Sequence, residues 1–457
     1  MMLSLALAAF VLAIPFGTRL LLYQAIPGFH EYEIVFLYGS DVLLLLVIGI
    51  ALVSEWRTVH AARRDRAFLP FVLFLAAALL SILAAPAPLL AFASFFRLLL
   101  LAAFAALFGS LIARRRGLFE RILILIAIAA VIQSVIGVTQ FKLQHAVGLS
   151  FLGESPIALD DPGTSRIAVG SARLVRAYGT FPHPNVLAGF LVLGLLALFH
   201  FYLHGMSERE RADVSKAVYV ARRTAVSAAI FIVAVGLTLT FSRAAWLTAF
   251  LTTLPFVLSG FRRGHVHVTQ TLPRIRASSI RFLASLLVMN YLLFAVLGWA
   301  VFPRVQVSTG EPAVQERLEY QAIGLSLFRK HPFGVGLGNQ VLAGVNEKLY
   351  QAHNRFAPYE QQPTHNLFLL IAIETGVFGL LGFLTFLAML IVRAARGGFP
   401  TEKITALTFM GAILTLGLFD HYLWTIGQGR LMLWLSVGLL MGFSLFAQPR
   451  SESSSTQ

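Results

Sequence analysis

The chain contains no cysteine among its 457 residues, and only 12% of the residues are charged. The lack of cysteine excludes disulfides, thiolate metal sites and a cysteine nucleophile. Soluble globular domains are about a quarter charged, so the shortage of charge excludes an ordinary soluble enzyme. The segments that carry the polar side chains contain no Walker motif, H-E-x-x-H motif or D-x-D cluster. These absences leave no sequence signature of nucleotide or metal chemistry.

Apolar residues, in contrast, make up 58% of the chain. A membrane-spanning helix needs about 20 mostly apolar residues, and twelve such runs predict an all-α, polytopic integral membrane protein with about 12 transmembrane helices. The first run lacks a basic start and a small-residue cleavage site, so we expect a retained helix rather than a cleaved signal. The runs are residues 2–22, 36–56, 68–86, 90–113, 121–142, 184–204, 224–241, 244–260, 282–302, 366–392, 404–424 and 430–447.

The net charge of +15 does not indicate a nucleic acid partner, because polytopic membrane proteins carry Lys and Arg in their cytoplasmic loops. Twelve crossings put both termini on one side, and the larger share of the 36 Lys and Arg residues falls on that side. We therefore predict cytoplasmic termini and two long outer segments, 143–183 and the large loop at about 303–363 between the ninth and tenth helices. Residues 1–450 are expected to form one membrane domain and 451–457 a disordered tail.

The clearest polar constellation opens the run 366–392, where His365 and Asn366 precede a long apolar stretch. On an ideal helix Gly376 and Gly379 lie within about 40° of His365 around the axis and roughly 16 Å or more along it. Such glycines allow a neighbouring helix or a lipid chain to approach closely. A histidine near a helix N-terminus also suits an anion, and an interfacial histidine that merely caps the helix is the competing interpretation.

Two arginines of the predicted outer face are candidates to hold phosphate oxygens. Arg243 follows Ser242 in a short turn, where its fork of donors suits phosphate; an arginine reaching to lipid headgroups is the alternative. Arg317 belongs to a predicted amphipathic helix that starts near Pro312 and lies on the membrane surface. Its apolar stripe consists of Val314, Leu318, Leu325 and Phe328. The glycines that follow, Gly334, Gly336 and Gly338, favour a tight loop, and a phosphate cradle is the weaker alternative.

Other polar residues lie at the ends of further runs. The segment RAYGTFPHPN places Arg176, His183 and Asn185 just before the run 184–204, and Asp420 and His421 end the run 404–424. His183, His331, His365 and His421 are far apart and lack a ligand spacing, so no metal is predicted.

Glu374 lies on the opposite side of the helix from His365, near the bilayer centre. We expect it to have a structural role and to be either neutral or paired, with Arg97 or Arg19 as the candidate partners.

Taken in order, these motifs resemble the bacterial O-antigen ligases. His365, Asn366, nine residues and Gly376, followed by Gly379, match the H-[NSQ]-x9-G motif of that family. RAYGTFPHPN, FSRAAW and HPFGVGLGN resemble its companion segments, and the resemblance covers about residues 170–395. O-antigen polymerases and protein O-oligosaccharyltransferases share this membrane domain, so the acceptor stays open.

The resemblance implies a metal-independent glycosyltransferase of the bacterial inner membrane, without a cofactor, that faces the periplasm. Its donor would be a glycan on undecaprenyl diphosphate, and its acceptor a glycolipid such as lipid A core or a growing polysaccharide. Arg243 and Arg317 match the family arginines and His365 the histidine required for activity. Asp420 is similar in position to a C-terminal aspartate, although its flanks match poorly. The expected substrate-binding residues are Asn366, Arg176, His183, Asn185, Asp420, Gly376 and Gly379.

The chemistry of the residues fits these roles. Two guanidinium groups, on Arg243 and Arg317, would stabilise charge on a leaving diphosphate, and His365 would accept the proton of the acceptor hydroxyl. Direct attack would invert the anomeric centre, because no carboxylate nucleophile is evident. The alternative role of His365 is that of a cation holding the diphosphate.

Two functions without chemistry compete with the enzyme: a flippase or exporter of lipid-linked glycan, and a scaffold in an envelope polysaccharide complex. A flippase should line its path with polar groups in both halves of the membrane. The residues singled out here gather at one face, which favours the enzyme.

Overall fold

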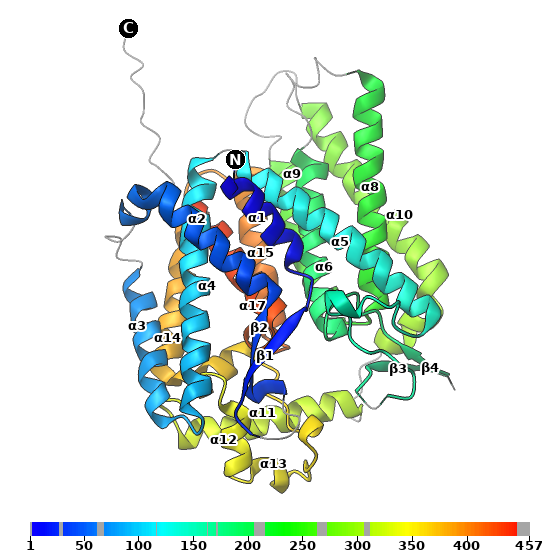
Figure 1. Cartoon of the computed structure of the whole chain (residues 1–457). Helices are drawn as coiled ribbons and strands as arrows, with labels where there is room; N and C mark the ends of the chain where they lie inside the picture. The colour runs from blue at the N-terminus through cyan, green and yellow to red at the C-terminus, as the bar shows by residue number, and fades with distance from the viewer. Residues whose placement is uncertain are drawn as a thin grey trace.

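The computed structural model describes residues 2–26, 31–61, 68–115, 117–161, 163–170, 172–204, 215–262, 272–305 and 311–445. Helices that run side by side form most of the molecule (Figure 1). Each of the twelve predicted runs overlaps an α-helix. These helices are α1 (Met2–Ala13), α2 (Gly39–Ala61), α3 (Phe68–Leu80), α4 (Pro88–Arg114), α5 (Leu118–Leu143), α6 (Pro184–His204), α8 (Lys216–Leu239), α9 (Arg243–Arg262), α10 (Leu272–Val305), α14 (Leu367–Ala395), α15 (Thr401–Gly417) and α17 (Gly427–Ser444).

Among the described residues, five helices are long and apolar enough to cross a membrane, namely α4, α5, α6, α8 and α14. Their length and composition agree with the predicted all-α membrane protein. One cluster of buried apolar side chains extends from Leu3 of α1 to Met441 of α17, and it holds the bundle together. The number of crossings and the extent of the membrane domain stay predictions. The predicted disordered tail, 451–457, lies outside the described residues.

The first predicted run is only partly helical. α1 ends at Ala13, and β1 (Arg19–Gln24) pairs antiparallel with β2 (Ile34–Tyr38), with Arg19 opposite Tyr38. Pro15 and Gly17 disfavour continuation of the helix, so the leucines that follow them form a strand. The expected helix over residues 2–22 is therefore wrong beyond α1. A second antiparallel hairpin joins β3 (Arg166–Val169) to β4 (Ala172–Val175).

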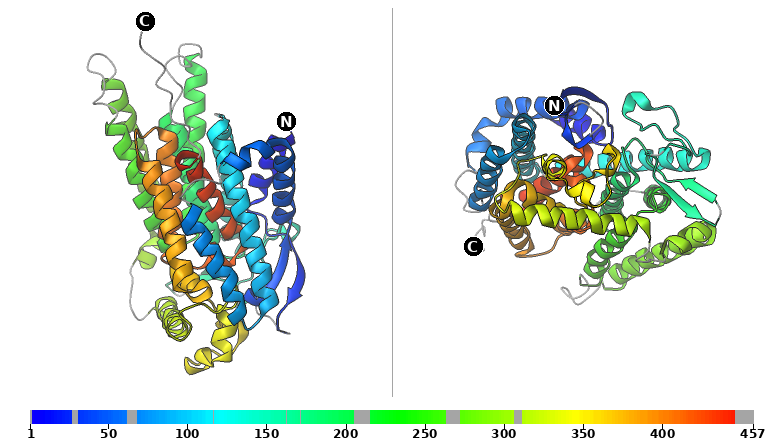
Figure 2. Two further views of the ribbon diagram at one scale, coloured as in Figure 1. Left: turned by 90° about the vertical axis from the view of Figure 1, so that its left-hand side faces the viewer. Right: turned by 90° about the horizontal axis from the view of Figure 1, so that it is seen from below.

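The segment between α10 and α14 covers one end of the bundle. It contains α11 (Pro312–Lys330), α12 (Gln340–Asn346) and α13 (Leu349–Ala352). These helices lie opposite the end where α1 starts and α17 finishes, and α11 runs across the bundle (Figures 1 and 2). The hairpin β3–β4 lies toward the same end (Figure 1).

The predicted amphipathic helix is confirmed as α11. Leu318 and Leu325 of its predicted apolar stripe are 57% and 40% exposed, whereas the opposite side of the helix is buried against the protein. The buried side chains are Tyr320, Ile323 and Leu327. Contact of the exposed stripe with a membrane surface stays a prediction.

α14 is interrupted at Gly376, whose φ of 75° and ψ of 177° are not helical. The loop before α12 enters this break: the Val335 N–H donates to the Ile373 carbonyl at 2.9 Å, and the Val377 N–H donates to the Pro332 carbonyl at 2.9 Å. A Cβ atom on Gly376 would lie 2.5 Å from the backbone carbonyl carbon of Phe333. The Gly-containing motifs of α14 and of the loop therefore pack against each other.

Glu374 does not pair with Arg97 or Arg19, as the sequence led us to expect. Its carboxylate accepts a hydrogen bond from the Trp424 indole N–H at 2.7 Å. Arg97 instead contacts Asp41 at 2.6 Å, and Arg19 contacts Glu31 at 2.8 Å. The expected arginine partner is therefore wrong, because both arginines have carboxylates closer to them on or beside the N-terminal hairpin.

The packing at Gly376 yields a stability prediction. We expect Gly376→Ala to lower the melting temperature of the detergent-purified protein by several degrees, because the backbone region it occupies is nearly restricted to glycine and costs about 1–3 kcal/mol for other residues. The steric clash with Phe333 adds to that cost.

The matched control is Gly397→Ala. Gly397 also has a positive φ, of 77°, but a Cβ added there would meet no atom closer than 4.0 Å. The melting temperature of this variant should fall less. Equal shifts for the two variants would show that the contact with Phe333 contributes nothing.

Candidate functional site

Three side chains that are far apart in sequence meet where α11 covers the bundle. His365 precedes α14, and Asp420 and His421 lie between α15 and α16 (Tyr422–Thr425). One ligand atom from each of the three lies within 4.8 Å of the others. The two imidazole rings meet edge to face, with centroids 4.8 Å apart. Asp420 and His421 are buried and His365 is half-buried. Of the three side chains, His365 is therefore the one that a substrate can reach from solvent.

Asn366 fixes the position of His365. Its Oδ1 caps α14 by accepting hydrogen bonds from the backbone N–H groups of Phe368 and Leu369, at 3.0 and 2.9 Å. Its Nδ2 donates to the carbonyl of Leu418 at 3.1 Å. The start of α14 is thereby tied to the segment that carries Asp420. Both the oxygen and the nitrogen of this side chain, which is predicted to bind substrate, thus contact the protein.

The His365 ring is oriented from two sides. Its Nδ1 lies 3.1 Å from the carbonyl of Pro363, and because a carbonyl only accepts, Nδ1 carries the proton. Nε2 of the neutral ring is then free to accept one. The ring of Tyr320, from α11, stacks on the imidazole with centroids 5.4 Å apart and an angle of 14°.

The predicted residues of RAYGTFPHPN reach the same cluster through Asp420. The Asn185 Nδ2 donates to the Asp420 carboxylate at 2.8 Å, and Arg176 Nη2 donates to Asn185 Oδ1 at 2.8 Å. Arg176 also donates to the Thr240 carbonyl at 2.6 Å. His183 Nδ1 accepts from the Asn185 backbone N–H at 3.1 Å. A continuous chain of hydrogen bonds therefore leads from Arg176 to the carboxylate.

The arginines of α9 and α10 share one carboxylate. Arg243 contacts Glu311 at 2.7 Å, and Arg304 binds the other oxygen of the same carboxylate. The three charges leave one positive charge in excess. Arg317 is near enough to the cluster for its charge to act on His365, His421 and Asp420. The site is therefore electropositive on the side of α9, α10 and α11.

The pKa values of the three histidines that lie beyond the helix ends, His365, His421 and His183, are set by burial and by the neighbouring charged groups. Burial lowers the pKa of His365, with Arg317 acting in the same direction and Asp420 opposing it. Burial, then His365, lowers the pKa of His421 to about 3. Burial, then Arg176, lowers the pKa of His183 to about 3. These histidines are therefore neutral near pH 7.

Asp420 behaves in the opposite way. Burial alone would raise the pKa of its carboxyl, but His421, His365 and Arg317 together outweigh burial and hold the pKa below its usual range. An ionised carboxylate thus lies beside neutral imidazoles, which is the arrangement that stabilises an imidazolium once a proton arrives.

His365, Asp420 and His421 are also side chains of the kind that bind metal ions, which their sequence spacing did not indicate. Zinc ligands at about 2.0–2.2 Å stand roughly 3.4 Å apart in a tetrahedral site, whereas these atoms spread over as much as 4.8 Å. The positive charge of Arg317 opposes a cation there. The spacing of these atoms and the charge of Arg317 therefore do not fit a bound metal ion, and a metal-independent reaction stays a prediction.

Gly376 and Gly379 lie away from the imidazole. Gly376 contacts the Phe333 backbone, and a Cβ on Gly379 would meet Thr375 and Ala77. The straight-helix geometry that aligned them with His365 does not apply, because α14 starts after Asn366 and breaks at Gly376. A role in substrate binding for either glycine stays a prediction.

Sequence reasoning missed four participants: Tyr320, Arg304, Glu311 and, as a member of the cluster, His421. Two of them could have been found from the sequence. His421 directly follows Asp420. Tyr320 lies three residues after Arg317, which puts Tyr320 and Arg317 on one side of a helix. No sequence pattern pointed to Arg304 and Glu311, because only the fold brings them to Arg243.

These features define a helical membrane protein in which histidines, a carboxylate and arginines gather at one end of an apolar bundle. Residues 228–384 match the family model described as O-antigen ligase. The match confirms the resemblance to the O-antigen ligase-related superfamily and supports a membrane enzyme of the ligase or polymerase type. It includes Arg243, Arg317 and His365, whereas Arg176 and Asp420 lie outside it. A search of the curated proteins finds no match.

Proposed function

We propose that the protein is an inverting, metal-independent glycosyltransferase that moves a glycan from undecaprenyl diphosphate to an acceptor hydroxyl. The observation that carries this proposal is the meeting of a neutral imidazole, on His365, with the Asp420 carboxylate and the Arg317 charge at one end of an apolar bundle. The enzyme would lie in the bacterial inner membrane, with this end in the periplasm and both termini in the cytoplasm.

In the proposed reaction the acceptor oxygen forms a bond to the anomeric carbon of the donor sugar while the bond from that carbon to the diphosphate oxygen breaks. The hydroxyl proton passes to Nε2 of His365, and the electron pair of the broken bond stays on the diphosphate. Asp420 stabilises the imidazolium, and Arg317 stabilises the departing diphosphate. Arg243 and Arg304, with a net positive charge beside Glu311, extend the region that attracts the diphosphate.

The lowered pKa of His365 favours the role of a base over that of a cation holding the diphosphate. A histidine whose pKa lies below its usual value is neutral at pH 7 and has a free lone pair at Nε2. The acceptor is open: a glycolipid such as lipid A core makes the enzyme a ligase, a growing polysaccharide makes it a polymerase, and a protein Ser or Thr makes it an oligosaccharyltransferase.

The first test is transfer by the purified protein in liposomes, with undecaprenyl-diphosphate glycan as donor, each acceptor in turn, and EDTA present. We expect transfer to one acceptor, and a loss of about 10²-fold or more in His365→Ala because general-base catalysis contributes that much.

His353→Ala is the matched control, since His353 is an exposed histidine beside α13 at the same end. Full activity of His365→Ala would refute the base, and a strict requirement for Mg²⁺ would refute the metal-free reaction. Movement of intact donor across the bilayer without transfer would favour a flippase.

The second test concerns the guanidinium group. Arg317→Lys keeps the positive charge but loses the bidentate fork, so we expect turnover to fall by roughly tenfold or more, the equivalent of one charge-assisted hydrogen bond. The control is Arg329→Lys, an exposed arginine in the last turn of the same helix. A wild-type rate in Arg317→Lys would argue against clamping of the diphosphate by that side chain.

The third test is the pH profile. Because the active form of His365 is neutral, kcat/KM should fall as the pH drops through a pKa that lies below 6.5. In Asp420→Asn the carboxylate that raises the pKa of His365 is lost, so the acid limb should move to still lower pH while the maximal rate decreases. An acid limb that moves to higher pH in this variant would contradict the assigned roles.

A further inference from the structure

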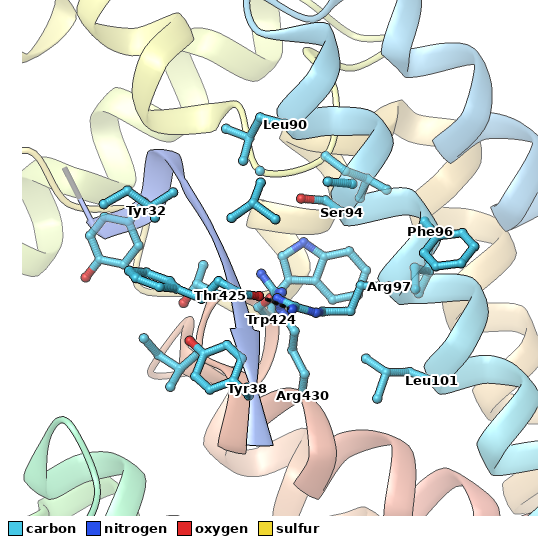
Figure 3. A pocket seen from close by; sticks show the side chains of 18 of the residues that line it. Tyr32, Tyr38, Leu90, Ser94, Phe96, Arg97, Leu101, Trp424, Thr425 and Arg430 are labelled. Carbon is cyan, nitrogen blue, oxygen red and sulfur yellow. Dashed lines mark hydrogen bonds between the residues drawn. The ribbon is translucent and has the colours of Figure 1, made fainter. Parts of the chain in front are cut away.

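A cavity of about 300 Å³, which the proposed chemistry does not use, lies beside the His365 cluster. It is lined by the β1–β2 hairpin, α4, the start of α12 with the loop before it, and the segment from α16 to α17 (Figure 3). Its volume is at the lower end of the range for small-molecule sites, about 300–1,000 Å³, so it has room for a headgroup or a sugar ring.

One wall of this cavity is shared with the catalytic cluster. Tyr32 lines the cavity, and its ring packs edge-on against His421 with centroids 5.6 Å apart. Thr425, another lining residue, has its Oγ1 2.8 Å from Nδ1 of His421. Pro363 also lines the cavity, and its carbonyl accepts the Nδ1–H of His365. A ligand held there is therefore next to the proposed base.

Two guanidinium groups converge in the cavity. Figure 3 shows the ends of Arg97 and Arg430 close together beside Trp424. Arg97 is neutralised by Asp41 at 2.6 Å. Arg430 donates from Nε to the Trp424 carbonyl at 2.5 Å, and no carboxylate forms a salt bridge with it in the part of the chain that the structure describes.

Each acidic residue that lines the cavity has its own hydrogen-bond or ion-pair partner. Glu374 accepts a hydrogen bond from the Trp424 indole N–H at 2.7 Å, and its charge also acts on Arg430 without a salt bridge between them. Glu31 is paired with Arg19. Among the described residues that line this cavity, no carboxylate forms a salt bridge with the terminal donors of Arg430, and these donors suit an anion.

The rim of the cavity is apolar and open to the outside of the bundle. Leu22, Leu45 and Phe96 line the cavity and are 56%, 46% and 54% exposed. In a protein that spans a membrane, exposed apolar side chains of this kind contact lipid chains. The cavity therefore combines an anion site with an apolar exit.

We propose that this cavity is the acceptor subsite and that the acceptor is an anionic lipid. Its negative headgroup is held by Arg430, with Arg97 beside it, and its apolar part leaves along Leu22, Leu45 and Phe96. This assignment rests on the proposed function.

The position of the cavity suits direct displacement, in which nucleophile and leaving group occupy opposite faces of the sugar. The hairpin and α4 lie on one side of the bundle, whereas α9 and α10, with Arg243 and Arg304, lie on the other (Figures 1 and 2). The acceptor thus approaches the sugar from the cavity while the diphosphate leaves toward α9 and α10.

Binding is tested without turnover through the indoles of Trp424 and Trp434, which both line the cavity. The protein in detergent micelles is titrated with dibrominated phosphatidic acid, whose bromines quench tryptophan fluorescence, and with dibrominated diacylglycerol as the neutral probe. We expect saturable quenching by the anionic lipid alone, about tenfold weaker in Arg430→Gln and intermediate in Arg430→Lys.

Arg223→Gln is the matched control, since Arg223 contacts Tyr202 and Tyr219 away from the cavity. Equal quenching by the neutral probe, or unchanged quenching in a folded Arg430→Gln variant, would overturn the anion site. Displacement of the lipid by millimolar inorganic phosphate would show a site for free phosphate rather than for a lipid.

Kinetics then separate this inference from the proposed function. In Arg430→Gln the KM for the acceptor should rise about tenfold, while kcat and the KM for the donor stay near wild type. A rise confined to the donor KM would overturn the acceptor assignment. If the wild-type protein transfers to no acceptor, the proposed function and the acceptor assignment fail together, whereas saturable lipid quenching would still establish the anionic-lipid site.

Discussion

The arrangement of the site depends on a backbone contact: the loop before α12 lies in the break of α14 at Gly376. The Val335 N–H donates to the Ile373 carbonyl and the Val377 N–H donates to the Pro332 carbonyl across this contact. Only a residue without a side chain leaves room there for Phe333. The contact anchors the whole segment from α11 to α13 on the bundle. Since α11 carries Arg317 and Tyr320 to His365, the geometry of the site depends on a glycine that never touches it.

The second constraint is electrostatic. An apolar bundle tolerates buried charge only where it is paired or hydrogen-bonded, and the site satisfies this rule through chains of polar contacts. Arg176 is connected to Asp420 through Asn185, so a buried cation and a buried anion stabilise each other across an amide. Asp420 itself stays ionised because His421, His365 and Arg317 outweigh burial and hold its pKa below the usual range.

The sequence allowed the helices and most residues of the candidate site to be predicted, because the signals were local. Long apolar runs marked twelve helices, and four ordered motifs pointed to His365, Arg317 and Arg243. The hairpin β1–β2 was missed because a run of leucines, Leu20 to Leu22, is compatible with a helix or a strand. Only the pairing with β2 decides between them. The pairing of Arg243 with Glu311, and the contact of Glu374 with Trp424, join residues 68 and 50 positions apart, a relation that no local pattern encodes.

Tyr320 and Arg317 lie on the same helix, one stacked on the imidazole and the other acting on it through charge. The Tyr320 hydroxyl is in turn fixed by a 2.6 Å hydrogen bond to the Glu360 carbonyl. Any force on α11 therefore acts on the ring and on its electrostatic surroundings at the same time. Under the proposed function, an anion bound by Arg317 would therefore act through α11 on the imidazole that serves as the base.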